Sequence, residues 1–162
     1  MIDIKRLSQN KWKDYQRIRL EALESDPIAF GSSYTEEKEF GAEVWKNRIG
    51  NTLFALIENK PIGMVGYLFN NKPSNKHVAS IFGMYVSKEY RNRGVGFQLL
   101  NNVMLSIKEN KDIRKIKLSV NPRQIYAVKL YRKYGFNSTG RSKDEYFIEG
   151  RFYDELLMEK LI

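Results

Sequence analysis

Apolar positions recur at two different spacings along the chain, and the change of spacing separates helices from strands. Residues 2–8 suit a short first strand, and apolar residues then recur at helical spacing after Asn10, a fair N-cap. Asp26-Pro27 ends this helix, because the residue before a proline disfavours the helical backbone. Ser33-Tyr34-Thr35-Glu36 has the pattern of a capping box and predicts a second helix through about Arg48.

The middle of the chain changes to a strand pattern. We expect strands at 52–58, 62–69 and 78–86, with a turn at Asn59-Lys60-Pro61 and a loop at 71–75. Gly83 lies inside the third of these strands. A glycine within a strand often marks a bulge or a close approach of another backbone, so we expect an irregularity there.

Strands and helices alternate in the second half. An apolar stripe predicts a helix after Gly96, Lys115–Val120 is the next strand, and a helix at about Gln124–Tyr134 follows. The tail, Tyr146–Leu161, is β-rich with Gly150 at a turn. The predicted order is β-α-α-β-β-β-α-β-α-β-β, which indicates a mixed sheet with helices on both faces, of α/β (α+β) class.

Length and composition indicate one domain over residues 1–162. The chain has no cysteine and a single histidine, His77, so a disulfide framework, a thiol nucleophile and a metal site are not expected. There is no run of 18 apolar residues, and the start of the chain lacks the apolar region of a signal peptide. We expect a soluble cytoplasmic protein that does not enter a membrane.

The net charge of +9 is unevenly distributed. Residues 88–133 contain twelve Lys and Arg against three acids, whereas residues 21–43 contain seven acids and one base. The basic half suits a polyanion, which would be a nucleic acid, a phosphorylated cofactor or an anionic membrane. The alternative is a solvated lysine-rich surface.

A glycine-containing loop, Arg91–Gly96, lies between a predicted strand and a predicted helix. Its glycines allow a tight turn, and the free N–H groups of the following helix favour an anion. The Gly-Lys-Ser/Thr of a P-loop is absent, and Leu99 stands where a dinucleotide fingerprint needs its third glycine. The loop therefore predicts a phosphate or pyrophosphate cradle, with a plain β–α turn as the alternative.

Two motifs resemble the GNAT superfamily of N-acetyltransferases. Arg91-x-x-Gly94-x-Gly96 resembles the family's Q/R-x-x-G-x-G/A signature, and residues 127–136 are similar to its A-x-x-L-Y-x-x-x-G-F stretch. The order of elements agrees over nearly the whole chain. The resemblance implies a mixed, mostly antiparallel sheet of about seven strands. It also implies acetyl-CoA as cofactor, with coenzyme A as product.

The resemblance further implies which residues bind the cofactor. Loop amides would hold the pyrophosphate, and the strand before the loop would pair with the pantetheine arm as an added strand does. Asn121 would hydrogen-bond that arm or the acceptor, or merely end its strand. The implied cofactor-binding residues are Met84, Tyr85, Val86, Arg91, Asn92, Arg93, Gly94, Val95, Gly96 and Asn121.

Acetylation of an amine requires two proton transfers. A lysine-type amine has a pKa of about 10.4, so it must lose a proton before it attacks a thioester. Tyr131 matches the family tyrosine that protonates the departing thiolate, although it would alternatively only pack beneath the cofactor. No carboxylate lies between Val78 and Val86, and Ser80 occupies the position where many members place a glutamate. The remaining candidate bases are a water chain or one of Glu21, Glu36, Glu37 and His77.

The acidic segment 21–43 predicts a cationic acceptor, because the family's acceptor usually binds against the first two helices. A polyamine, an amino sugar, or a lysine or N-terminal amine of a protein would fit, within a site formed by Phe30, Tyr34, Glu36 and Tyr67. The alternative is that these acids are simply a solvated helix face.

Two other functions remain open on the same fold. One is a basic RNA- or ribosome-associated module, although we do not expect nucleic acid to be the partner. The other is a non-catalytic acetyl-CoA sensor. A homodimer through the apolar tail is a further possibility.

Overall fold

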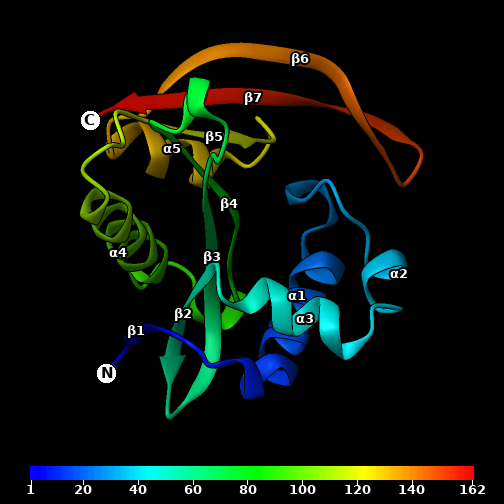
Figure 1. Cartoon of the computed structure of the whole chain (residues 1–162). Coiled ribbons are helices and arrows are strands. Elements are labelled where there is room, and N and C mark those ends of the chain that lie inside the picture. The colour runs from blue at the N-terminus through cyan, green and yellow to red at the C-terminus, as the bar shows by residue number, and fades with distance from the viewer.

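Seven strands form one continuous sheet in the order β1-β2-β3-β4-β5-β7-β6 (Figure 1). The computed structural model describes all residues, 1–162. The strands are β1 (Asp3–Arg6), β2 (Thr52–Ile57), β3 (Lys60–Phe69), β4 (Val78–Val86), β5 (Lys115–Val120), β6 (Asn137–Ile148) and β7 (Arg151–Leu161). Only β4 and β5 are parallel, which confirms the mixed, mostly antiparallel sheet.

The helices lie on both faces of this sheet (Figure 1). They are α1 (Trp12–Ser25), α2 (Tyr34–Glu37), α3 (Ala42–Ile49), α4 (Val95–Glu109) and α5 (Ile125–Lys133). The apolar stripe of α4 packs with Val65, Ile81 and Tyr131 in one core, while α1 and α3 pack over Phe54 and Met64 in a second core. No helix is both long enough and apolar enough to span a membrane.

Several predicted boundaries are wrong. The turn expected at Asn59-Lys60-Pro61 lies at Glu58 and Asn59, and β3 already begins at Lys60. The helix expected through Arg48 is two helices, α2 and α3, because the chain turns inward at Phe40, whose carbonyl accepts a hydrogen bond from Trp45 Nε1 at 3.1 Å. The first helix begins at Trp12, after a 3-10 turn over Gln9–Lys11. Strand β6 begins at Asn137 rather than near Tyr146. It is an exposed strand at the edge of the sheet, and its sequence lacks the alternation of apolar and polar residues that identifies a half-buried strand.

At Gly83, strand β4 has one residue more than the segment of β3 that faces it. The register pairs Gly66 with Phe82 and Met64 with Tyr85, so two steps along β3 face three along β4. Gly83 has a φ of +60°, which favours glycine. The expected bulge is therefore present, and it places Phe82 and Tyr85 on the same face of the sheet.

Strand β4 stops pairing with β5 after Ser80, before the bulge is reached. The two strands pair only from Val78 to Ser80, opposite Lys115–Lys117. Strand β5 continues to Val120 in pairing with β7 instead. The second half of β4 therefore presents an unpaired backbone edge toward β5.

The left-handed backbone at Gly83 gives a stability prediction. We expect Gly83→Ala to lower the free energy of unfolding by about 1–2 kcal/mol, because a β-carbon is strained at positive φ. Gly50→Ala is the matched control, since Gly50 has a φ of −62° and no atom lies within 4 Å of an added β-carbon. Urea unfolding of both variants checks the difference, and equal stabilities would contradict a strained conformation at the bulge.

Candidate active site

The loop before α4 presents a group of free backbone amides. Asn92 and Gly94 both have positive φ, at 62° and 77°, and Gly94 is the N-cap of α4. The amides of residues 92–97 find no acceptor in the chain. Converging amides at the start of a long helix bind anions, so the predicted phosphate cradle has the conformation it requires.

The side chain of Arg91 connects this loop to β4 and to the end of α1. Its Nε donates to the carbonyl of Val86 at 2.8 Å, and its guanidinium forms an ion pair with Asp26 at the end of α1. The guanidinium also lies over the ring of Tyr85, 5.5 Å from the centroid. Arg91 therefore fastens the loop to β4 and α1, and the anion-binding capacity of the cradle rests mainly on backbone N–H groups.

The hydroxyl of Tyr131 on α5 reaches Met84, in the part of β4 that does not pair with β5. The ring of this tyrosine is buried against Phe136, and its hydroxyl donates to Sδ of Met84 at 3.4 Å. Burial raises the pKa of Tyr131 to about 12. The phenol is therefore protonated at neutral pH, and its hydroxyl has only a weak thioether acceptor.

Asn121 directly follows β5. Its Nδ2 donates to the carbonyl of Ile28 at 3.2 Å, and its Oδ1 accepts the N–H of Arg123 at 2.9 Å. Both polar ends of the side chain are thus engaged by the protein. These bonds attach the segment after α1 to the end of β5, on the side away from α4.

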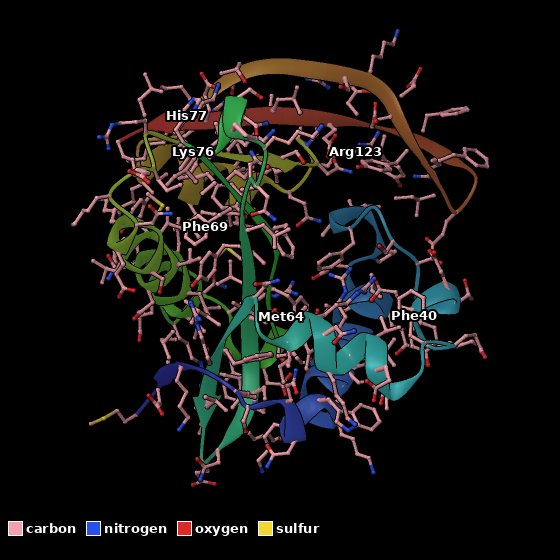
Figure 2. The ribbon with its side chains drawn as sticks, in the orientation of Figure 1. Phe40, Met64, Phe69, Lys76, His77 and Arg123 are labelled. Atoms are coloured by element: carbon pink, nitrogen blue, oxygen red, sulfur yellow. The ribbon has the colours of Figure 1, made fainter.

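A cavity of about 330 Å³ lies on the α1 and α3 side of the bulge. Gly83 is part of its wall, and Met64 lines it from β3 (Figure 2). Its other lining residues are Tyr15, Arg19, Ser32, Glu37, Arg48, Asn51, Thr52, Gly66, Leu68 and Phe82. A ligand here would meet the strand β4 at the point where that strand leaves β5.

The charged groups of the cavity form one fixed cluster. Glu37 is buried and accepts from Nε and Nη2 of Arg19, both at 2.9 Å, while Nη1 of Arg48 lies 3.2 Å away. Burial alone would raise the pKa of Glu37, but the hydrogen bonds and charges of the two arginines lower it below its usual 4.5. Two guanidinium groups therefore face one carboxylate, and the cluster has a net positive charge.

Aromatic rings hold both guanidinium groups from one side. Arg19 lies over Phe30 at 4.9 Å and Arg48 over Phe40 at 4.8 Å from the ring centroids. Stacking and ion pairing together leave each guanidinium little freedom. Arg19 and Arg48 were missed from the sequence, because nothing local marks an arginine as part of a cavity.

The predicted acceptor residues do not come together. Phe30 reaches the cavity only through the guanidinium of Arg19, and Tyr34 and Glu36 lie on α2 outside the lining. Tyr67 points to the opposite face, where it is buried in the α4 core and accepts a hydrogen bond from Arg6. The alternation of β3 explains this, since Met64, Gly66 and Leu68 face the cavity.

The candidate bases are either engaged or remote. Glu21 accepts from the hydroxyls of Tyr85, at 3.0 Å, and Ser87, and Glu37 is paired with two arginines. His77 lies just before β4, at the end of the strand away from Met64 (Figure 2). Neither carboxylate is thus a free base.

The comparisons with known proteins agree with this geometry. The model of the acetyltransferase (GNAT) family matches residues 12–136. The chain belongs to this family, and it is an N-acetyltransferase that uses acetyl-CoA.

Several relatives cover almost the whole chain. It is 27% identical over 154 residues to the L-amino acid N-acetyltransferase AaaT of Escherichia coli, covering 92% of this chain and 93% of that protein. A GNAT-family acetyltransferase from Streptococcus pneumoniae has the same fold, with a TM-score of 0.88, 24% identity and coverage of 100% and 99%. The yncA acetyltransferase of Salmonella typhimurium, solved with acetyl-CoA, gives a TM-score of 0.80 at 12% identity, covering 99% and 94%.

The buried cluster gives a pH-dependent stability prediction. We expect Glu37→Gln to lower the free energy of unfolding at pH 7 by about 3 kcal/mol, because two guanidinium groups lose their counter-charge. The lowered pKa of Glu37 contributes stability above pH 4.5, its usual value, and this contribution is lost as pH falls through the native pKa. Urea unfolding should show that the difference in free energy of unfolding between wild type and variant becomes smaller below that pH. A difference that is constant with pH would contradict the ionised state of Glu37.

Proposed function

We propose that this enzyme transfers the acetyl group directly to the α-amino group of an amino acid, with Tyr131 as general acid. The observation that supports the acceptor is the cavity beside the bulge, in which Arg19 and Arg48 outnumber Glu37. Such a site suits the carboxylate of an acceptor. The name of the Escherichia coli relative, an L-amino acid N-acetyltransferase, favours the same class.

The residues present fit acetyl-CoA. The free amides of 92–97 suit its phosphates, and the unpaired edge of β4 beyond Ser80 suits an extended amide-containing arm. When bound, acetyl-CoA supplies an acetyl group activated as a thioester. Met84 and Val86 would provide the backbone contacts, and Asn121 would hold the end of β5 beside them.

The charge of the cavity argues against the cationic acceptor expected from the sequence. That expectation counted the acids of residues 21–43 without their partners. In the structure Glu37 is neutralised by arginines, Asp26 by Arg91, and Glu21 is bonded to Arg17, Tyr85 and Ser87. Of the acids of this segment only Glu37 lines the cavity, and Arg19 and Arg48 beside it attract a carboxylate rather than a polyamine.

The chain's own groups account for the proton transfers. Transfer would replace the carbon–sulfur bond of the thioester with a bond from the acetyl carbon to the acceptor nitrogen. Starting from the ammonium form, the nitrogen would lose one proton before attack and a second on forming the amide, and the sulfur would gain one. Tyr131 donates the proton to the sulfur, since its hydroxyl already reaches Met84 on the unpaired part of β4. Water in the cavity accepts the proton of the amine, because Glu21 and Glu37 are engaged. Solvent then returns a proton to Tyr131.

The general-acid role gives a kinetic prediction. We expect Tyr131→Phe to lower kcat by about 100-fold or more, with little change in KM for acetyl-CoA, because the phenyl ring retains the packing and loses only the proton. Thiol release measured from pH 6 to 9 checks this. Because the pKa of Tyr131 is raised to about 12, the wild type should show no loss of rate from its ionisation in that range.

Tyr134→Phe is the matched control for this measurement. Tyr134 is the C-cap residue of the same helix, and its hydroxyl donates to Asn101 at 2.7 Å rather than to Met84. Its variant should retain wild-type kcat. A Tyr131→Phe enzyme as fast as this control would show that the tyrosine only packs in the site.

An acceptor panel tests the substrate class. We expect turnover with free amino acids to exceed turnover with their amides and with polyamines, because only the free acids present a carboxylate to Arg19 and Arg48. Arg48→Gln should raise KM for the amino acid about tenfold, as expected for the loss of a charge-assisted hydrogen bond, and leave KM for acetyl-CoA unchanged. Preference for a polyamine would restore the cationic acceptor. Binding of RNA without binding of acetyl-CoA would contradict the proposal that these residues form an active site.

A further inference from the structure

We propose that Leu68 and Phe82, together with Gly66, form a subsite for a large apolar side chain of the acceptor. The inference rests on the proposed function and adds the side-chain class to it. It concerns the apolar part of the cavity wall, which has no role in the proposed binding of the carboxylate or in the proposed proton transfers. Three observations support it, namely the exposure of the two apolar residues, the packing of Phe82 on Gly66, and their position relative to Arg19.

The apolar face of β3 and β4 is uncovered only at the cavity. Met64 and Tyr85 lie on this face beneath α1 and α3 and are 1% and 4% exposed. Leu68 and Phe82 lie on the same face and are 46% and 43% exposed, and both line the cavity. Burying such surface against a ligand is favourable, at about 25 cal/mol per Å² of apolar area.

Gly66 determines how Phe82 lies on the sheet. A β-carbon placed on Gly66 would be 2.4 Å from Cε2 of the Phe82 ring and 2.7 Å from its Cζ. The ring therefore lies directly on the backbone of β3, in space that any other residue would fill. A larger residue at this position would lift the ring into the cavity and narrow the space beside Leu68.

The one guanidinium nitrogen of Arg19 that is not bonded to Glu37 determines where the carboxylate of the acceptor lies relative to Phe82. Nε and Nη2 are bonded to Glu37, while Nη1 lies 3.5 Å from the β-carbon position of Gly83, next to Phe82. In an amino acid the carboxylate, the amine and the side chain share one carbon atom. A carboxylate on Nη1 therefore places the amine at the bulge and the side chain within reach of the adjacent phenyl ring.

The chemistry of the wall defines the side-chain class. Leu68 and Phe82 offer no hydrogen-bond partner, so a charged side chain would lose its hydration against them without compensation. A small side chain would leave the wall exposed to water. Each methylene that fills such a subsite changes kcat/KM by about 10-fold or more. We therefore expect leucine, methionine and phenylalanine to be preferred over alanine and glutamate.

The test compares kcat/KM for leucine, phenylalanine, alanine and glutamate in four proteins. In the wild type we expect leucine or phenylalanine to exceed alanine by about tenfold or more. Phe82→Ala should reduce that ratio about tenfold by removing the wall, and Gly66→Ala should reduce it by lifting the ring. Phe147→Ala is the matched control, because Phe147 is an exposed aromatic residue on β6, outside the cavity.

The possible failures are distinguishable. Turnover of all four amino acids at similar rates would overturn the subsite and leave the proposed acceptor class intact. Equal losses on alanine and leucine in both cavity variants would also overturn it, since a general distortion does not discriminate side chains. No turnover of any amino acid, with acetyl-CoA still bound, would overturn the acceptor class and the subsite together.

Discussion

The extra residue of β4 at Gly83 is the constraint on which the rest of the site depends. It places Phe82 and Tyr85 on the face of α1 and α3, and Met84 on the face of α4. It also lies three residues beyond Ser80, the last residue of β4 that pairs with β5. The inserted residue is therefore part of the unpaired edge of β4 and of the cavity wall at the same time.

Helix α1 connects the two halves of the site. Its Arg19 joins the cavity cluster, its Glu21 accepts from the hydroxyls of Tyr85 and Ser87, and Asp26 directly after its end forms an ion pair with Arg91. These contacts reach the cavity, the end of β4 and the loop before α4. A displacement of α1 would accordingly move the cavity wall and that loop together, although the helix contributes no amide to the loop.

The features that were predictable from the sequence are local ones. The cradle depends on glycines and a helix start within six residues, and the bulge on one glycine inside a strand, so both are visible in a short segment. The side of β3 to which Tyr67 points and the neutralisation of Glu37 depend on partners far along the chain. Glu37 meets Arg19 across 18 positions, and the prediction of a cationic acceptor counted the acids of this segment without such partners.

Because the side chain of Arg91 is bonded to Asp26 and to the carbonyl of Val86, the proposed binding of the cofactor's pyrophosphate rests on the free main-chain N–H groups of the loop. Peptide N–H groups do not titrate near neutral pH, so their contribution to the affinity for a pyrophosphate does not change across that range. Their orientation follows from φ and ψ rather than from side-chain identity. Exposed positions such as Arg93 can therefore vary in evolution while the cradle stays intact, and the chemical selectivity of the enzyme can diverge on the other face of the sheet.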